Sequence, residues 1–212
     1  MSIQKDMHIK WQKTHITRED KEKLLNQKGA LLWFTGLPAS GKSTIANSLE
    51  KELYKQDYLT IVMDGDNIRH GLNKNLGFSK EDRSENIRRI GEVAKLFVET
   101  GVLTITAFIS PYRTDRDNVR SMLKNSEFIE IYVKCPLSEL ERRDPKGFYK
   151  KAKEGLIKEF TGISAPYEAP LNPEIVLDTS KSSMEECVKT ILYYLNRFKI
   201  VNKPAKLSDL KI

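Results

Sequence analysis

The sequence predicts an α/β fold in which a parallel sheet is covered by helices on both faces. Short apolar segments alternate along the chain with segments whose apolar residues recur at helical spacing, which is typical of such a sheet. Residues 102–109 (VLTITAFI) are almost all apolar or β-branched, as expected of a strand that is buried on both faces. Hydrophobic residues make up 39% of the 212 residues, which is enough for one domain with its own core.

Each expected element has a local reason. The first strand is a short apolar run that stops at Gly36, and the second is interrupted by Asp64. The longest helix begins after Ser79, whose hydroxyl can cap the first turn, and it ends at Gly101. In chain order we expect strand 31–35, helix 43–55, strand 60–63, helix 79–101, strand 102–109, helix 113–123, strand 128–133, strand 175–177 and helix 183–198.

Three segments fall outside this alternation. Residues 1–28 are polar and charged, and we expect them to form an N-terminal arm that packs on the domain made by residues 29–200. We expect residues 201–212 to form a C-terminal tail. Residues 141–170 follow the fourth strand and are rich in Lys, Gly and Pro; so long an insertion is typical of a mobile lid or a binding segment. An ordinary solvated helix with a loop is the alternative.

Composition excludes several classes of protein. Cys135 and Cys187 lie far apart without CxxC spacing, which argues against a zinc finger or a disulfide-rich scaffold, and we expect both to be buried and structural. No apolar run approaches the ~20 residues of a transmembrane helix, and the N-terminus lacks the apolar core of a signal peptide. We therefore expect a cytoplasmic protein. The net charge of +7 suggests acidic partners without choosing among nucleic acid, membrane surfaces and small anions.

The strongest functional motif is GLPASGKS at residues 36–43, which fits the phosphate-loop pattern GxxxxGK[ST]. A predicted strand precedes it and a predicted helix follows it, which makes a chance glycine-rich turn a weak alternative. Backbone N–H groups and the helix N-terminus would bind phosphate oxygens, Lys42 would bridge the β- and γ-phosphates, and Ser43 would ligate Mg²⁺. The motif makes the predicted fold a P-loop NTPase-type three-layer sandwich. We expect ATP contacts from Gly36, Leu37, Pro38, Ala39, Ser40, Gly41, Lys42, Ser43 and Thr44.

Two carboxylates follow the second predicted strand. Ligands gather at the carboxyl ends of parallel strands, so Asp64 and Asp66 should lie near the phosphate loop. Asp64 could hold a magnesium-bound water, and Asp66 is our first choice to orient or deprotonate an attacking hydroxyl. The alternative is a turn in which Asp-Gly makes only local hydrogen bonds.

A second group of side chains could bind an anionic acceptor. Arg83 and Asn86 are three residues apart at the start of the long helix and share a face. Arg69 and Arg83 could bind the acceptor through forked hydrogen bonds, or they could simply face solvent. Phe78 lies in the loop before this helix, where it could stack on a base or fill the core.

The end of the third strand and the 141–170 segment add further candidates. Ser110 lies on the ligand edge of the sheet, where it could contact the acceptor or bond only to backbone. Within 141–170, basic side chains are concentrated, and closure over a triphosphate could bring one or two of them to the transferring group. They are Arg142, Arg143, Lys146, Lys150, Lys151, Lys153 and Lys158.

From about residue 9 to residue 198 the sequence resembles the adenylyl-sulfate kinase (APS kinase) family. The phosphate loop is generic, but later strings are specific to that family, among them DGDNIRHGLN, LGFSKEDRSENIRRIGEVAKLF, FISPYRTDRDNVR and RDPKGFYKKAKEGLIKEFTGISAPYEAP. The resemblance implies transfer of the γ-phosphoryl group of MgATP to the 3′-hydroxyl of adenosine 5′-phosphosulfate (APS), which gives 3′-phosphoadenosine 5′-phosphosulfate (PAPS) and ADP. It implies Mg²⁺ and a homodimer, with ATP and APS as partners and neither nucleic acid nor membrane.

The resemblance also implies roles for particular residues. Catalysis would fall to Lys42, Asp64, Asp66 and Ser110, with the metal at Ser43 and, through water, at Asp64, and Arg142 would join the ATP contacts. Ser110 matches a serine to which a phosphoserine intermediate is often attributed, although direct in-line transfer accounts for the site with fewer parts. Contacts with APS would come from Asp66, Arg69, Phe78, Arg83, Asn86, Ile109, Ser110, Lys146 and Phe160, with Phe78 and Phe160 clamping adenine.

Two departures from the family pattern are visible. The phosphate loop reads LPAS where LSGS is common, so Pro38 removes one backbone N–H, and Asn75 stands where an acidic residue is usual.

Two rival functions stay open from the residues themselves. One is a kinase for another small acceptor such as a nucleoside, shikimate or gluconate, and the other is a nucleotide-gated binding module without turnover.

Overall fold

The computed structural model describes residue 10 and residues 12–124 and 126–201. Trp11, most of the N-terminal arm before it and the tail from residue 202 onward therefore lie outside the described residues. The elements are α1 (Arg18–Leu25), β1 (Ala30–Thr35), α2 (Lys42–Lys55), β2 (Thr60–Asp64), α3 (Gly65–His70), α4 (Lys80–Val98), β3 (Leu103–Ala107), α5 (Arg113–Ser121), β4 (Phe128–Lys134), α6 (Leu137–Arg143), α7 (Phe148–Lys153), β5 (Ile175–Asp178) and α8 (Met184–Arg197).

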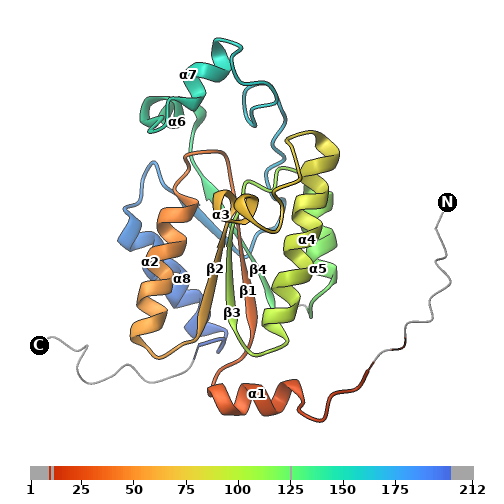
Figure 1. Ribbon diagram of the computed structural model, residues 1–212. Helices are drawn as coiled ribbons and strands as arrows, with labels where there is room; N and C mark the ends of the chain where they lie inside the picture. Colours follow the sequence, from red (N-terminus) through yellow and green to blue (C-terminus); the bar gives the residue numbers. More distant parts are fainter. Residues whose placement is uncertain (1–9, 11, 125, 202–212) are drawn as a thin grey trace, which may run out of the picture.

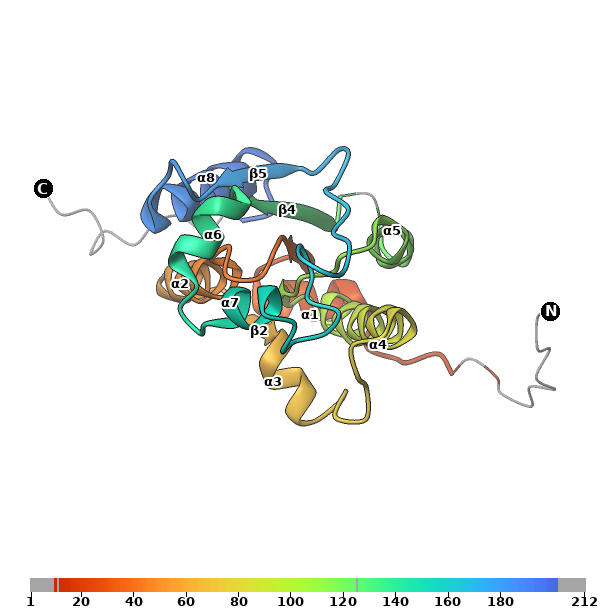
Figure 2. The ribbon, with the colours of Figure 1, turned by 90° about the horizontal axis from the view of Figure 1, so that it is seen from above.

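A five-stranded parallel sheet with strand order β2-β3-β1-β4-β5 forms the middle layer (Figures 1 and 2). β1 lies at its centre, and Leu32 is in register with Ile105 of β3 on one side and Ile129 of β4 on the other. Because β1 leads into the phosphate-loop segment, that segment lies at the carboxyl edge of the sheet and in the middle of it. The predicted parallel sheet is confirmed.

Helices cover both faces because successive side chains of each strand point to opposite faces. Leu32 and Phe34 of β1 pack with α2 and α8 in one apolar cluster. Leu31 and Trp33 pack against α4 and α5 in a second cluster on the other face. Figure 1 shows these two pairs of helices flanking the sheet, which gives the predicted three-layer sandwich.

Helix boundaries follow from capping side chains. Ser79 Oγ accepts a hydrogen bond from Asp82 N at 3.1 Å and starts α4. Ser183 and Glu186 form a capping box that starts α8. Cys135 and Cys187 are free thiols, and both are buried in apolar clusters, as predicted.

The structure corrects the extent of the third strand. The apolar pattern predicts a strand from 102 to 109, but β3 ends at Ala107. The chain leaves the sheet there because Ser110 adopts φ of +40° and its carbonyl is drawn to Arg116 Nη1 at 2.6 Å. Helices α1, α3, α6 and α7 were not predicted as separate elements. The six-residue α3 follows β2 where the alternative interpretation had an Asp-Gly turn, and Asp64 caps it.

Candidate active site

The phosphate-loop segment 36–43 joins β1 to α2 at the carboxyl edge of the sheet. Gly36 and Gly41 adopt φ of +152° and +99°, values that glycine adopts readily and residues with a Cβ do not. At Gly36 a Cβ would also collide with the carbonyl oxygen of Val133 in β4. The path of the backbone therefore requires both glycines. It brings the N-terminus of α2 to a cleft that is lined by Gly41, Lys42 and Ser43.

Lys42 is buried at the start of α2. Its Nζ donates hydrogen bonds to Leu37 O at 2.7 Å, to Gly36 O at 2.9 Å and to Ser40 Oγ at 3.4 Å. Burial lowers the pKa of Lys42 to about 7, and the carboxylate of Asp64 opposes that shift. An anionic phosphate at the loop would favour the ammonium form.

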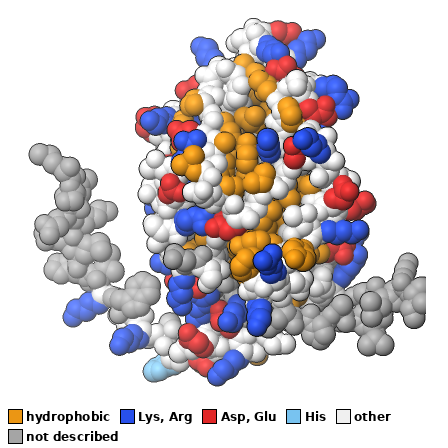
Figure 3. Space-filling view, turned by 180° about the vertical axis from the view of Figure 1, so that it is seen from behind, with side chains coloured by type: hydrophobic (Ala, Val, Ile, Leu, Met, Phe, Trp, Pro, Cys, Tyr) orange, Lys and Arg blue, Asp and Glu red, His pale blue; other side chains and the backbone are white. Residues whose placement is uncertain are grey.

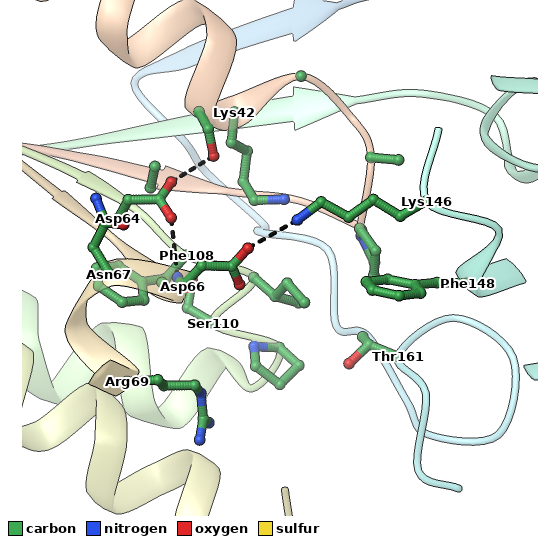
Figure 4. Close-up of a pocket in the computed structure, with 18 of the residues that line it drawn as sticks. Lys42, Asp64, Asp66, Asn67, Arg69, Phe108, Ser110, Lys146, Phe148 and Thr161 are labelled. Atoms are coloured by element: carbon green, nitrogen blue, oxygen red, sulfur yellow. Dashed lines mark hydrogen bonds and ion pairs between the residues drawn. The ribbon is translucent and has the colours of Figure 1, made fainter. Parts of the chain in front are cut away.

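Ser43 and Asp64 bring two hard oxygen atoms together beside the loop. Ser43 Oγ donates to Asp64 Oδ2 at 2.5 Å, while Asp64 Oδ1 accepts from Asp66 N at 3.0 Å (Figure 4). One carboxylate oxygen thus caps α3 and the other faces Ser43. Groups of three or more His, Cys, Asp or Glu that could hold a metal are absent from the described residues. A hydroxyl with one carboxylate suits Mg²⁺ that keeps phosphate and water ligands, so these residues fit the metal.

Asp66 projects from the first turn of α3 toward the segment between α6 and α7. Lys146 Nζ donates to Asp66 Oδ2 at 2.9 Å, and this hydrogen bond raises the pKa of Lys146 above its ordinary value (Figure 4). Both side chains remain exposed. The contact connects the predicted lid to the carboxylate expected to act on the acceptor.

The residues expected to bind the acceptor lie on α3, on the loop that follows it and on α4. Phe78 is 58% exposed, so it does not fill the core. The guanidinium of Arg69 lies 4.4 Å from the centre of the Phe78 ring, and Arg69 Nη1 donates to the carbonyls of Leu76 and Gly77. This edge of the cleft therefore presents an aromatic face backed by positive charge.

Arg83 is buried, which rules out the solvent-facing alternative. Its Nε donates to Phe78 O at 2.8 Å, Nη1 donates to Thr161 Oγ1 at 3.0 Å, and Nη2 donates to Glu159 O at 2.5 Å. Because Phe78 precedes α4 and the other two partners follow α7, Arg83 joins both walls of the acceptor side. Asn86 is buried one turn further along the same face, as the spacing predicts.

Ser110 is held from two directions. Trp33 Nε1 donates to Ser110 Oγ at 3.1 Å, and Arg116 Nη1 donates to the Ser110 carbonyl. In the described part of the chain, no carboxylate or imidazole forms a hydrogen bond with Ser110 Oγ. The Ser110 hydroxyl therefore accepts one hydrogen bond and keeps its own hydrogen available as a donor.

One cleft of about 1170 Å³ brings the two ends of this site together. All the residues with a predicted catalytic, metal, ATP or APS role line it except Gly36, Leu37, Ser40 and Arg142. The first three still shape the loop. Arg142 makes an ion pair with Glu139 at 2.8 Å and its side chain is 74% exposed, so its ATP contact stays a prediction. Of the other basic candidates in 141–170, Lys158 lines the cleft, whereas Arg143, Lys150, Lys151 and Lys153 do not. His15 and His70 do not line the cleft, and His8 lies outside the described residues.

Sequence reasoning missed three residues that shape the site. Burial raises the pKa of Tyr149 and keeps its hydroxyl protonated, so it donates to Pro38 O at 2.9 Å and ties α7 to the phosphate loop. Thr161 accepts from Arg83, and Arg116 is buried against Glu130 at 2.7 Å. Their partners lie up to 111 residues away in sequence, so local patterns carry no signal for these contacts.

Of the two sequence departures, Pro38 lines the cleft through the phosphate loop, and its carbonyl is used by Tyr149. Asn75 Oδ1 accepts from Arg89 Nη1 at 2.8 Å, so its amide takes the place that an acidic side chain would hold.

No helix among the described residues has the length and apolar character needed to cross a bilayer.

A parallel sheet with a phosphate loop at its central strand, in a cleft whose other end is lined by Arg and Phe, defines a P-loop phosphotransferase for a small acceptor. A family model described as adenylylsulphate kinase matches residues 28–178. The chain therefore belongs to the adenylylsulphate kinase family and is a phosphotransferase.

Individual relatives agree over nearly the whole chain. The adenylyl-sulfate kinase of Oceanobacillus iheyensis is 62% identical over 193 residues, which are 91% of this chain and 97% of the relative. That of Staphylococcus epidermidis is 57% identical over 194 residues, covering 92% and 98%. The solved Mycobacterium tuberculosis APS kinase in complex with AMPPNP and APS superposes with a TM-score of 0.77 at 42% identity, covering 80% of this chain and 99% of that one. These likenesses confirm the predicted P-loop NTPase-type fold.

Proposed function

We propose that this chain transfers the γ-phosphoryl group of MgATP directly to the 3′-hydroxyl of APS, giving PAPS and ADP. The observation that carries the proposal is that one cleft contains both Lys42 of the phosphate loop and the Asp66, Arg83 and Asn86 group. Family membership supplies the reaction. The contacts of the cleft support a division into an ATP end and an acceptor end.

At the ATP end, backbone N–H groups of the loop and the N-terminus of α2 bind the phosphates. Ser43 and Asp64 would hold Mg²⁺ together with phosphate and water oxygens, and the ion would offset charge on the triphosphate. Lys42 Nζ already lies among the loop carbonyls of Gly36 and Leu37. From there it supplies positive charge to the transferring group, where negative charge must be stabilised.

At the acceptor end, Phe78 and Phe160 line the same cleft and are suited to hold the adenine between them. Phe160 is oriented by an edge-to-face contact with Tyr149, with ring centres 5.0 Å apart. Arg69 and Arg83 bring two guanidinium groups to the anionic phosphosulfate, and Ile109 adds an apolar contact.

Asp66 is placed to orient or deprotonate the 3′-hydroxyl. Its Oδ2 accepts a hydrogen bond from Lys146 Nζ, which leaves Oδ1 to accept one from the 3′-hydroxyl. Ser110 already accepts from Trp33, so it is suited to donate one hydrogen bond rather than to attack phosphorus. These contacts therefore favour direct in-line transfer, in which Asp66 acts on the 3′-hydroxyl and Ser110 donates a hydrogen bond.

A coupled ADP-release assay tests the proposed reaction. With MgATP and APS we expect steady turnover and a PAPS product, and with a nucleoside, shikimate or gluconate as acceptor we expect only background hydrolysis. Turnover with one of the other acceptors in place of APS would support a different small-molecule kinase. Nucleotide binding without turnover for any acceptor would support the binding-module alternative.

Arg83→Ala should weaken APS binding by roughly ten- to a hundredfold, because a hydrogen bond to a charged group contributes about 1.5–3 kcal/mol. ATP binding should change little, since Arg83 contacts no residue of the phosphate loop. Isothermal titration with each nucleotide measures both effects. Arg83→Lys is the matched control, because it keeps the charge and loses the fork. Equal losses for APS and ATP would show that Arg83 supports the fold instead.

The homodimer and the cytoplasmic location both stay predictions. β5 is an edge strand of the sheet, and apolar side chains gather over the middle of the face that carries β5 and α8 (Figure 3). Val176, Tyr193 and Phe198 are exposed there, which supports self-association through this face.

A further inference from the structure

Asn73 is a fully buried polar residue in the loop of residues 71–79 that joins α3 to α4 (Figure 1). Its Nδ2 donates a hydrogen bond to Asn86 Oδ1 at 2.9 Å. Asn86 is only 6% exposed, and it lines the acceptor end of the cleft while Asn73 does not. A buried amide thus stands directly behind a side chain that faces the acceptor.

Asn73 is in turn held against Arg89, one turn beyond Asn86 on α4. Arg89 Nη1 lies 2.8 Å from Asn75 Oδ1, 3.3 Å from Leu72 O and 3.5 Å from Asn73 Oδ1. Arg89 Nε donates to Glu85 Oε1 at 2.8 Å. Hydrogen bonds from Arg88 and Arg89 lower the pKa of Glu85 to about 2, so this anchor of the guanidinium stays ionised.

The chemistry of a guanidinium decides how both amides are turned. Arginine offers only donors, so the amide of Asn73 must direct Oδ1 toward Arg89 and Nδ2 toward Asn86. Asn86 then uses Oδ1 to accept from Asn73, which leaves its Nδ2 for the cleft. Reversing Asn73 would place its NH₂ donors against the donors of the guanidinium and take its NH₂ away from Asn86 Oδ1, although Arg89 Nη1 would keep Asn75 Oδ1 and Leu72 O as acceptors.

We infer that Arg89 and Asn73 are positioning residues that fix Asn86 as a hydrogen-bond donor to an acceptor atom of the bound nucleotide. A phosphosulfate group offers only acceptor oxygens, and adenine ring nitrogens are acceptors as well, so a donor at this position fits the nucleotide. The inference rests on the proposed function and deepens it. It assigns a specificity role to Asn73, which does not line the cleft.

Asn73→Asp is the informative substitution, because it keeps the size of the side chain and removes its only donor. The new carboxylate keeps its contact with Arg89 as an ion pair, but it can only accept from Asn86. Asn86 must then turn its NH₂ toward that carboxylate and present Oδ1 to the cleft. We expect the KM for APS to rise roughly tenfold or more, with the KM for ATP nearly unchanged.

Two further variants separate positioning from a general structural effect. Asn75→Asp is the matched control, since Asn75 contacts the same Arg89 nitrogen at 2.8 Å but not Asn86, and its KM for APS should equal that of the wild type. In an Asn86→Ala background, Asn73→Asp should cause no further rise in that KM, because Asn73 acts through Asn86.

The inference is overturned if Asn73→Asp leaves the KM for APS unchanged, raises both KM values equally, or adds its full effect in the Asn86→Ala background. Should Asn73→Asp fail to fold, Asn86→Asp gives the same test, since it still accepts from Asn73 but offers the cleft only oxygen. Asn86→Asp with wild-type KM for APS would also refute a donor role. Wild-type turnover with APS in the same assay shows whether a failure belongs to the proposed function or to this inference.

Discussion

Lys42→Ala should lower kcat/KM by at least ~10²-fold while the protein remains folded. Lys42 Nζ lies among three oxygens of the phosphate loop, and it is the cation placed to offset charge on the transferring phosphoryl group. Alanine removes that charge from a buried position, where water cannot supply the same stabilisation of the transition state. Initial rates with varied MgATP and APS measure the loss, and circular dichroism reports the fold.

Lys55→Ala is a matched control for this change. Lys55 is the last residue of the same helix, is exposed, and pairs with Glu52 at 2.8 Å. Its removal should leave kcat/KM at the wild-type value, because Lys55 does not line the cleft. The protein should also remain folded, because a surface ion pair contributes at most ~1 kcal/mol to stability. A folded Lys42→Ala protein with near-normal turnover would refute the assignment of residues 36–43 as the ATP site.

Arg116→Ala should lower the free energy of unfolding by roughly 3–5 kcal/mol, the cost of breaking a buried ion pair. Arg116 and Glu130 are 2% and 8% exposed, so alanine leaves the Glu130 carboxylate, among the described residues, with only the longer ion pair to Arg120 at 3.4 Å. Arg116 also donates to the carbonyls of Ser110 and Glu168, which would both lose a partner. Urea unfolding of the purified variant measures the change.

Two other arginine variants define the cause of that loss. Arg116→Lys keeps the charge but cannot reach three acceptors at once, so it should fall between the wild type and alanine. Arg88→Ala removes an exposed ion pair on α4 and should cost less than ~1 kcal/mol. If Arg116→Ala were as stable as Arg88→Ala, the buried network would not hold the loop that carries Ser110.

Much of the fold could be predicted because its signals are local. The phosphate-loop pattern places the β1–α2 junction, and Ser79 and Ser183 mark the starts of α4 and α8 through their own hydroxyls. α3 was missed because Asp64-Gly65-Asp66 resembles a turn, although an aspartate before a short polar run is also a cap signal. Local chemistry could have suggested that helix.

Other features depend on contacts that are distant in sequence. The end of β3 is set by Arg116, which binds the Ser110 carbonyl and also the carbonyl of Glu168, 52 residues further along. The burial of Arg83 depends on Glu159 and Thr161, which return to α4 only after the chain has passed through α7. Apolar periodicity carries no information on such pairs, so it could not predict how these side chains lie relative to one another.

Ser110→Ala should keep measurable turnover, with a loss of about tenfold that corresponds to one hydrogen bond. Direct transfer requires this outcome, because the attacking oxygen then belongs to the acceptor and Asp66 serves it. An obligatory phosphoserine intermediate would instead make the alanine variant inactive. Steady-state rates of the wild type and the variant, measured with saturating MgATP and APS, distinguish these two results.

The stereochemical course of the reaction tests direct transfer between the two ends of the cleft more sharply than any variant. ATP made chiral at the γ-phosphorus with oxygen isotopes is turned over with APS, and the configuration of the phosphoryl group in the product is determined. A single in-line step inverts the configuration, so we expect inversion. Net retention would show two successive transfers through a covalent intermediate and would contradict the mechanism, even if Ser110→Ala kept part of its activity.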